Sequence, residues 1–486
     1  MPFNSTSMIH DLRADFEKLL MLVTSPEAAT ATLDQMERSL LRQVLCLGLK
    51  LLTLFLQTRT AAEAHDGLRA GRKRWPYHSQ KDRDYFSIFG KVTFGRAYFY
   101  SVRHGGQVPL DAALSVPAHC YSDVLMESAE VLAIEGSYTK GIQVLARLLG
   151  LELAEAAVET TAADHAETVD AFYAQQAPSP AQDEGVLLVA QADGKGVPLV
   201  RPPDDTAPAV RRGKGAKKTR KKEAIVTAVY TIDRYPRTPA DVVNALFRKS
   251  PLPDPRPEPC GKRVFASLQG KTAALERLAS WTQPRDGNHI RGRVALTDGA
   301  RALQTQMQTH LSDFTLVLDL LHVSEHLWKA GTALYGETNP EREAWVETQL
   351  GDLLASRVKT VIRHLESHQR DESLSKTIRR TVGQVAHYLQ RNQPYMDYAT
   401  YLRRGWPIGT GVIEGTCRHL VKDRMELAGM RWTIPGAEAI LALRAVNENG
   451  DWEAFHAFRR AQRHQHLYGK PMNTAWLAQA EHLQIN

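Results

Sequence analysis

The chain has 486 residues, of which 61 are Lys or Arg and 54 are Asp or Glu, giving a net charge of +7. This length has room for about three domains of roughly 150 residues, and the positive charge permits a nucleic-acid partner without requiring one. The four cysteines are widely spaced and form no CxxC pair, so they give no indication of a zinc site and fit a reducing cytosol.

The N-terminal region is predicted to be mainly helical. Apolar residues recur at helical spacing in residues 8–56 and indicate a helical pair. Residues 44–56 are the most apolar, but Lys50 interrupts them and they are shorter than the roughly 20 residues of a membrane span, so we expect a buried helix and no membrane partner. The N-terminus lacks the order of a secretory signal, which favours a cytoplasmic location.

Two further patterns complete the N-terminal region, residues 1–175. Residues 85–100 are rich in aromatic and β-branched side chains and predict a short hairpin. Residues 137–169 predict two helices with a turn near Gly150. This spacing fits a helix-turn-helix that binds DNA, and it equally fits two packed helices of a domain that never touches DNA.

A Pro-rich polar segment near residues 175–185 predicts a domain boundary. Beyond it we expect strands at residues 186–192, 197–201 and 224–232, with DGKG as a tight turn between the first two. A helix, a strand ending at Asp298, another helix and the strand FTLVLDLLHV follow. This order is that of the ribonuclease H-like fold, an α/β core with a mixed five-stranded sheet, in which the first and fourth strands are neighbours.

Residues 324–401 show only long helical periodicity with charge on one side. They separate the fifth predicted strand from Glu414, which opens a predicted helix. We therefore expect an all-helical insertion that divides the core into residues 186–323 and residues 402–486, the second part carrying Glu414 and a C-terminal helical tail.

Asp193, Asp298 and Glu414 are candidate metal ligands. Asp193 and Asp298 follow apolar strands, which deliver carboxylates to the edge of a sheet, and a helical Glu near that edge would complete a site for two divalent ions, Mg²⁺ or Mn²⁺. Taken singly, each residue has a simpler interpretation: a hairpin turn for Asp193, a helix N-cap for Asp298 and an ordinary helix start for Glu414. Their joint order favours the metal site.

A family resemblance rests on four segments in order, DGKG, LTDGA, LDLLHVSEHLWKAG and GTGVIEGTCRHLVKDRMELAGMRW, within about residues 82–455. Together they resemble the DDE transposases of bacterial insertion sequences, in particular the ISKra-type group related to Mutator-like elements. The resemblance implies that Asp193, Asp298 and Glu414 are the catalytic triad. Relatives often carry cysteine pairs around the early hairpin, which this chain lacks, so the resemblance does not extend to a zinc-stabilised N-terminal module.

The resemblance also implies an Asp-x-x-His pair after the fifth strand, here Asp319 and His322. Two interpretations of this pair stay open. It can lie next to the site, where it orders DNA or a catalytic carboxylate. Alternatively, Asp319 caps the following helix and His322 is a core histidine.

Basic residues supply the candidate DNA contacts. Residues 211–222 hold eight basic side chains and no acid; such a run is usually a solvated loop, yet beside an active site it would attract phosphates. These residues are Arg211, Arg212, Lys214, Lys217, Lys218, Arg220, Lys221 and Lys222. Further candidates after Glu414 are Arg418, Lys422, Arg424, Arg431 and Trp432, for which charge balance and a buried Trp are the simpler interpretations.

The predicted function is metal-dependent cleavage at transposon ends followed by strand transfer into target DNA. The expected partners are both DNAs and at least a second copy of the chain when DNA is bound. The alternatives are a related nuclease or host-adopted transposase that cuts without strand transfer, and a DNA-binding protein that has lost catalysis.

Overall fold

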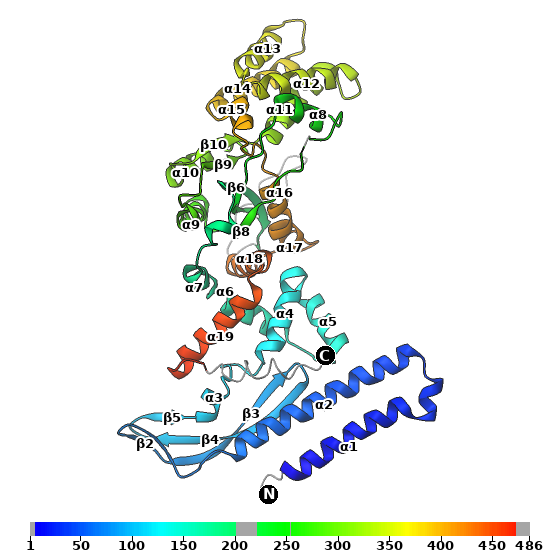
Figure 1. Ribbon diagram of the computed structural model, residues 1–486, viewed down its shortest axis with the longest axis vertical. Helices are drawn as coiled ribbons and strands as arrows, with labels where there is room; N and C mark the ends of the chain where they lie inside the picture. Colours follow the sequence, from blue (N-terminus) through cyan, green and yellow to red (C-terminus); the bar gives the residue numbers. More distant parts are fainter. Residues whose placement is uncertain (1–4, 201–220, 253, 473–486) are drawn as a thin grey trace, which may run out of the picture. The chain divides into compact units, whose positions relative to one another are not determined.

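The computed structural model describes residues 5–200, 221–252 and 254–472 (Figure 1). The chain forms two compact units, one of Met1–Thr168 with Glu453–Asn486 and the other of Val169–Trp452. The sequence-based division assigned residues 402–486 to the core. Helix α19 (Trp452–Tyr468) instead groups largely with the N-terminal unit, because its buried residues contact that unit's own helices.

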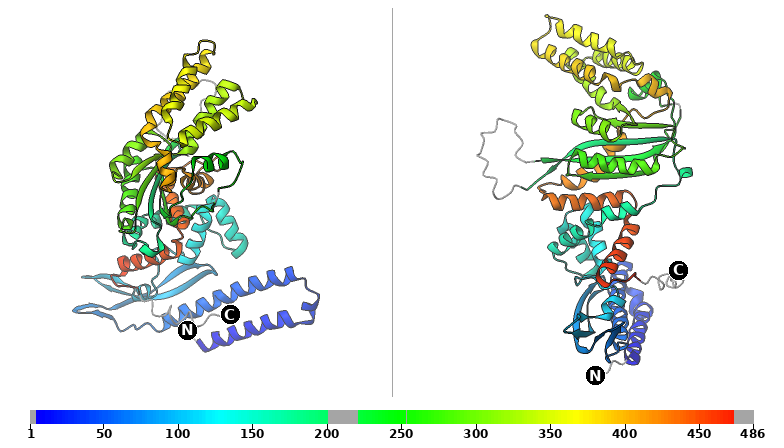
Figure 2. Two further views of the ribbon diagram at one scale, coloured as in Figure 1. Left: turned by 45° about the horizontal axis from the view of Figure 1, so that its top comes forward. Right: turned by 90° about the vertical axis from the view of Figure 1, so that its left-hand side faces the viewer.

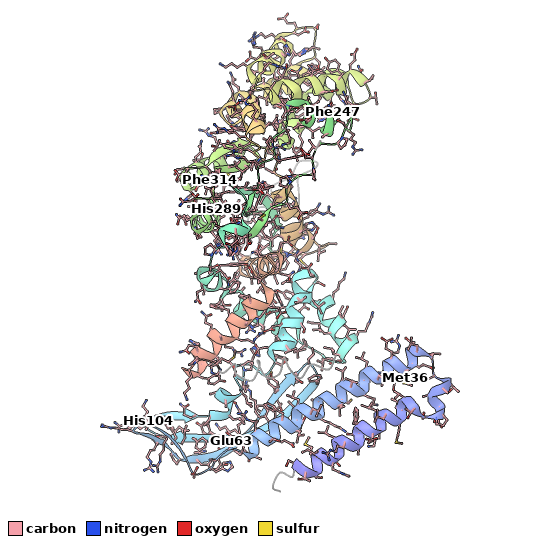
Figure 3. All side chains as sticks on the ribbon, viewed as in Figure 1. Met36, Glu63, His104, Phe247, His289 and Phe314 are labelled. Carbon is pink, nitrogen blue, oxygen red and sulfur yellow. The ribbon has the colours of Figure 1, made fainter. Side chains whose placement is uncertain are left out.

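The N-terminal unit begins with the predicted helical pair, α1 (Ser5–Thr24) and α2 (Leu33–Ala61), joined by η1 (Pro26–Thr30). A capping box between Thr32 and Gln35 starts α2. The expectation that residues 44–56 are buried is wrong, because only Leu56 of α2 is buried and its other apolar side chains remain exposed or half-buried (Figure 3). By length and composition, α2 is the one helix of the described residues that could cross a membrane, a test that some soluble core helices and signal sequences also pass.

The predicted hairpin is present but longer than expected. It pairs β3 (Tyr77–Ser87) with β4 (Gly90–Ser101), and β5 (Gly105–Gln107) extends it to three strands. β1 (Leu68–Ala70) and β2 (Lys73–Trp75) form a separate small ribbon. Glu63, which follows α2, accepts a hydrogen bond from the amide of Ala97 in β4 at 2.8 Å and so ties the helix to the sheet (Figure 3).

The two-helix pattern around Gly150 is also present. After α3 (Pro109–Ala113) and α4 (Asp123–Glu135), α5 (Tyr138–Leu149) ends at Gly150 and α6 (Glu155–Ala166) follows. Gly150 has a φ of 68°, the left-handed conformation that ends helices and favours glycine. Whether these helices bind DNA stays a prediction.

A mixed five-stranded sheet organises the second unit. Its strands are β6 (Leu187–Pro198), β7 (Lys221–Ile232), β8 (Cys260–Ser267), β9 (Gly292–Thr297) and β10 (Thr315–Leu318). They lie in the order β10-β9-β6-β7-β8, with β6, β7 and β8 antiparallel and β6, β9 and β10 parallel. This arrangement is compatible with a ribonuclease H-like core, and the expected neighbours, the strands before Asp193 and Asp298, do pair.

Three strand predictions need correction. DGKG is not a turn, because β6 runs straight through it and pairs with β7 along its whole length. The third strand is therefore β8, which the sequence pattern did not indicate. The last strand is shorter than predicted: β10 ends at Leu318, because Asp319 caps a helix that begins at Leu320.

Helices cover both faces of the sheet (Figure 2). Alternate side chains of the strands enter a separate apolar core on each face. One face, including Leu188 and Ala190, packs against α9 (Lys271–Thr282) and α10 (Arg301–His310). The other, including Leu187 and Val189, shares a core with the helices that follow β10. The position of the strands between two helical layers leaves only the strand ends open to solvent.

Residues 324–401, all of them described, contain no strand. Their helices are α11 (Leu320–Tyr335), α12 (Pro340–Leu354), α13 (Val358–Arg370), α14 (Lys376–Asn392) and α15 (Tyr398–Arg403), with η4 (Gln393–Tyr395) between the last two. After these helices the chain returns to the end of β10, since the amide of Leu320 donates to the carbonyl of Ile408 at 2.9 Å. The segment thus leaves and rejoins the sheet at one place.

The chain after the return covers the sheet edge. α16 (Gly411–Thr416), the π-helix η5 (Cys417–Lys422) and α17 (Asp423–Met425) lead to α18 (Ile434–Glu448). Asn449 accepts a hydrogen bond from the amide of Val264 and donates one to its carbonyl, which satisfies the backbone of edge strand β8. The remaining short elements of this unit are α7 (Val169–Gln175), η2 (Ala181–Asp183), α8 (Pro239–Leu246) and η3 (Gln283–Arg285).

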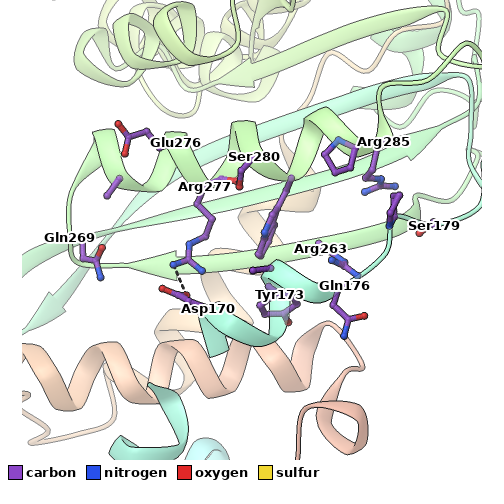
Figure 4. A pocket seen from close by; sticks show the side chains of 15 residues that line it. Asp170, Tyr173, Gln176, Ser179, Arg263, Gln269, Glu276, Arg277, Ser280 and Arg285 are labelled. Atoms are coloured by element: carbon purple, nitrogen blue, oxygen red, sulfur yellow. Dashed lines mark hydrogen bonds and ion pairs between the residues drawn. The ribbon is translucent and has the colours of Figure 1, made fainter. Parts of the chain in front are cut away.

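A pocket of about 680 Å³ opens between α7, α9 and β8 (Figure 4). Tyr173 and Trp281 line it, and Arg277 forms an ion pair with Asp170 at 2.7 Å across it. None of the predicted catalytic acids lines this pocket. The candidate chemistry therefore lies elsewhere on the same unit.

Candidate active site

Strand register brings Asp193 and Asp298 together. β6 and β9 pair in parallel from Leu187 opposite Gly292 to Gln191 opposite Leu296. Continuing this register by two residues places Asp193 opposite Asp298. Asp193 lies inside β6, not at its end as expected, but it lies just beyond the point where pairing with β9 stops.

Burial and the neighbouring carboxylate of Asp298 raise the proton affinity of Asp193. Burial raises the pKa of Asp193, the hydrogen bond from the Gly194 amide at 2.6 Å opposes this effect, and the negative charge of Asp298 raises the pKa further. Asp298 accepts a hydrogen bond from the amide of Ala300 at 2.8 Å, which holds its side chain over the strand end. This pairing of acids is a place where a cation would be stabilised.

Asp319 occupies the same edge one strand further along. Its amide donates to the carbonyl of Thr297 at 3.0 Å, so the carboxylate follows β10 as Asp298 follows β9. One oxygen of the fully buried carboxylate caps α11 by accepting from the amide of His322 at 3.0 Å. The other accepts from the amide of Thr410 at 2.9 Å. Asp319 therefore joins the start of α11 to the segment that leads into α16.

Asp319 and His322 form an ion pair, with Asp319 Oδ2 2.6 Å from His322 Nδ1. Burial alone would raise the pKa of Asp319, but the hydrogen bonds from His322 and the two amides outweigh burial and lower it. The same hydrogen bond raises the pKa of His322 to about 9, which favours the charged imidazolium at neutral pH. The capping interpretation of Asp319 is correct, whereas His322 is half-buried at the site and is not a core histidine.

Glu414 approaches this pair from α16. Its carboxylate is exposed and accepts a hydrogen bond from the hydroxyl of Thr410 at 3.1 Å. Ligand atoms of Asp319, His322 and Glu414 all lie within 4.8 Å of one another. From the following turn, the thiol of Cys417 donates to Asp193 Oδ2 at 3.4 Å. The same short helical segment thus contacts both acidic groups of the sheet edge.

Gln191 is a positioning residue that the sequence pattern did not single out. It is fully buried, its Oε1 accepts from the amide of Ile413 at 2.9 Å, and its Nε2 donates to the hydroxyl of Tyr230 at 3.0 Å. The amide of Ile413 is one of the donors that a helix start leaves without an intrahelical partner. A polar residue inside the apolar run LLVAQAD was the available signal.

Gln191→Leu is expected to lower the free energy of unfolding by about 1–3 kcal/mol, because the amide of Ile413 loses its buried acceptor. Gln308→Leu is the matched control, since Gln308 also donates to a Tyr hydroxyl, that of Tyr395 at 2.9 Å, but on the surface. Urea unfolding of both variants measures the difference. Equal losses would contradict the anchoring role of Gln191.

The inserted helices contact the loop after β9. The hydroxyl of Tyr388 on α14 donates to the carbonyl of Asp298 at 3.1 Å, and Arg391 donates to the carbonyl of Gly299 at 2.9 Å. Gly299 has a φ of 92°, and a Cβ there would lie 2.9 Å from the Tyr388 hydroxyl. The backbone of this loop is therefore held by the insertion as well as by the sheet.

The predicted basic loop lies mostly outside the described residues. Arg211, Arg212, Lys214, Lys217, Lys218 and Arg220 belong to residues 201–220, which the structure does not describe. Lys221 and Lys222 begin β7, where Lys221 forms an ion pair with Glu426 and Lys222 is half-buried. Their contact with DNA stays a prediction.

The basic residues after Glu414 divide by exposure. Arg418, Lys422 and Arg431 are exposed and remain candidates for DNA contact. Arg424 and Trp432 are buried, so the prediction that they contact DNA directly is wrong. The Arg424 guanidinium lies 4.6 Å from the Trp432 ring, and Trp432 Nε1 donates to the carbonyl of Met425 at 3.1 Å. The alternative of a buried Trp, weighed from the sequence, is the correct one.

No protein-family model and no curated protein sequence matches the chain. Among solved structures, the Drosophila P element transposase strand transfer complex is similar at 9% sequence identity, over 74% of this chain and 86% of that chain, with a TM-score of 0.25. A likeness at this level assigns neither a fold to this chain nor a role to any of its residues.

Proposed function

We propose that the protein is a DDE-type DNA transposase of the ISKra-type group, with a ribonuclease H-like catalytic core. The observation that carries the proposal is the parallel register of β6 and β9, whose continuation by two residues sets Asp193 opposite Asp298, with Glu414 on the helix packed over the same sheet edge. Three carboxylates delivered to one edge by different elements match what phosphoryl transfer assisted by metal ions requires.

The donor set fits hard divalent cations. Asp193, Asp298 and Glu414 offer carboxylate oxygens, which Mg²⁺ and Mn²⁺ prefer, and the crowding of Asp193 against Asp298 leaves negative charge for a cation to neutralise. When bound, two such ions would supply charge neutralisation at the scissile phosphate and activation of the attacking oxygen. Asp193 presents its carboxylate from β6 and Asp298 from the loop after β9, whereas Glu414 presents its carboxylate from the exposed surface of α16.

The remaining site residues act on position and charge. Asp319 fixes α11 and the Thr410 segment, and His322 places a positive charge beside Glu414 where a DNA phosphate would approach. Residues 211–222, together with Arg418, Lys422 and Arg431, would attract the phosphate backbone. The partners are transposon-end and target DNA in the bacterial cytoplasm, held by a homodimer or larger assembly because two transposon ends must be brought together.

A nuclease or host-adopted transposase that cleaves without strand transfer would use the same acids, and a DNA-binding protein without catalysis would not need them. The test incubates the full chain with duplex DNA containing the native ends of the flanking element, with Mg²⁺ or with EDTA. We expect strand cleavage at the ends and joining to a target plasmid only with Mg²⁺. Cleavage without joining would favour the nuclease, and binding without cleavage would remove the catalytic proposal.

A further inference from the structure

A ladder of charged residues joins α4 and α19 within the N-terminal unit. Asp123, Glu127 and Glu130 recur at intervals of four and three residues and so share one face of α4. Arginines of α19 pair with the first two acids at 2.5–3.0 Å. These arginines are Arg459, Arg460 and Arg463.

The charge pairing differs at the last acid of this face, Glu130. Glu130, whose side chain is 0% exposed, has two histidines beside it where the other acids have arginines. Its Oε1 lies 2.5 Å from Nδ1 of His165 on α6, and its Oε2 lies 3.7 Å from Nε2 of His456 on α19. The side chains of His165 and His456 are 7% and 0% exposed. A carboxylate and two imidazoles thus converge in a water-excluded core.

Glu130 is not satisfied by hydrogen bonds. Among the described residues, neither of its oxygens nor Nδ1 of His165 has a hydrogen-bond partner of acceptable geometry, although the two residues touch. A buried carboxylate without compensation is strongly destabilising. The unsatisfied atoms of Glu130 and His165, with a second buried imidazole beside the same carboxylate, are the features of a cation site.

We propose that Glu130, His165 and His456 bind one zinc ion, which fastens helices α4, α6 and α19 to one another. Zinc is the cation of choice because two imidazole nitrogens and a carboxylate are its common ligands, whereas Mg²⁺ and Ca²⁺ favour all-oxygen sites. Both oxygens of Glu130 face the histidines, so a bidentate carboxylate would complete four-coordination.

The geometry needs only small adjustments. Ligand atoms around a tetrahedral zinc ion lie roughly 3.3 Å apart, given metal–ligand distances of about 2.0–2.2 Å. The two nitrogen–oxygen distances at Glu130, 2.5 and 3.7 Å, lie on either side of that value. Ligand atoms of the three residues are all within 4.8 Å of one another. Side-chain rotations suffice to accommodate the ion.

The carboxylate of Glu127 lies where a second carboxylate commonly orients a zinc-bound histidine. Nδ1 of His456 lies 3.5 Å from Oε1 of Glu127, so a proton on Nδ1 would leave Nε2 available to the metal. Nε of Arg459 also approaches this nitrogen at 3.3 Å and favours the opposite tautomer in the absence of metal. Metal binding would therefore place the His456 proton on Nδ1, toward Glu127, and would replace the hydrogen bond from Arg459.

The site would be structural and not catalytic, because none of the three ligand side chains is more than 7% exposed. A structural ion needs no route for substrate. The three ligands are far apart along the chain, so a bound metal would join distant segments. α19 follows the whole catalytic unit, and a metal shared with α4 and α6 would hold this late helix to the N-terminal unit when the unit folds.

The first test is the zinc content of the full-length wild-type protein, purified after growth with added zinc and dialysed against metal-free buffer. We expect about one zinc per chain, and a visible spectrum typical of four-coordinate Co²⁺ after cobalt exchange. Asp193→Asn should retain the same zinc content, which separates this site from the acids of the second unit. A wild-type protein with less than about 0.1 zinc per chain and a Tm unchanged by added zinc would overturn the proposal.

The second test compares His165→Gln with His466→Gln, an exposed histidine on α19. The first variant should lose at least tenfold in zinc affinity and the second should keep the wild-type value, with circular dichroism as the check on folding. A third variant, Glu130→Gln, tests whether Glu130 only shares a proton with His165. In that case Glu130→Gln would keep the wild-type Tm, and neither the wild-type protein nor this variant would bind zinc. That result would also overturn the proposal, and the transposase proposal would be unaffected.

Discussion

Asp193→Asn is expected to abolish Mg²⁺-dependent strand cleavage while leaving the affinity for end DNA unchanged. The amide keeps the shape of the side chain but removes the negative charge next to Asp298. The loss of rate should exceed the roughly 10–100-fold loss that follows removal of a group that only orients a metal ligand. Gel-based cleavage assays with pre-formed protein–DNA complexes measure the rate of the chemical step separately from binding.

Asp313→Asn is the matched control for this experiment. Asp313 is exposed, precedes β10 and lies outside the acidic groups of the sheet edge. We expect it to cleave at the wild-type rate. If Asp193→Asn retained cleavage within tenfold of the control, Asp193 would not be a metal ligand and the proposed triad would be wrong.

Arg285→Ala is expected to lower the free energy of unfolding by about 3–5 kcal/mol, the range for removal of one partner of a buried ion pair. The side chains of Arg285 and Glu184 are 5% and 1% exposed and 2.8 Å apart. The guanidinium also donates to the carbonyls of Gly261 and Cys260 at 2.8 and 3.2 Å. The substitution would leave a buried carboxylate and carbonyls of edge strand β8 without donors.

Arg293→Ala provides the comparison within the same unit. Arg293 pairs with Asp286 at 2.7 Å, but its side chain is 36% exposed, and surface pairs contribute about 0–1 kcal/mol. Chemical denaturation of both variants gives the two losses, and adding Glu184→Gln to Arg285→Ala should recover part of the larger one. Losses that agree within about 1 kcal/mol would show that the buried pair is no more important than the surface pair.

The element order of the core could be predicted from sequence, because apolar runs and helical periods alternate clearly there. The identity of the third strand could not. β8 is half-buried at its start, and its residues Gly261, Lys262 and Arg263 do not read as a strand without the partner β7 beside it. The segment DGKG was wrongly predicted as a turn because it contains two glycines. Pairing with β7 keeps Gly194 and Gly196 extended.

At the candidate site, the pairing of the strands that lead to Asp193 and Asp298 could be predicted, but the contacts between the side chains could not. Asp193 and Asp298 were placed on neighbouring strands because their strands follow the order of a known fold. The grouping of Glu414 with Asp319 and His322 depends on the hydrogen bonds of Thr410, which connect segments separated by the helical insertion. The burial of Arg424 and Trp432 was not predictable for a similar reason, since Trp432 pairs with Leu199 far back in the chain.

The alternation of side chains along β6 has a consequence for how this protein can change during evolution. Asp193 shares a face with Leu187, Val189 and Gln191, the face that packs against the inserted helices. Gain or loss of one codon between Leu187 and Asp193 would preserve backbone pairing but turn the carboxylate toward α9 and α10. Natural length variation is therefore expected in the loops between inserted helices, such as residues 371–375, and should be excluded from the first half of β6.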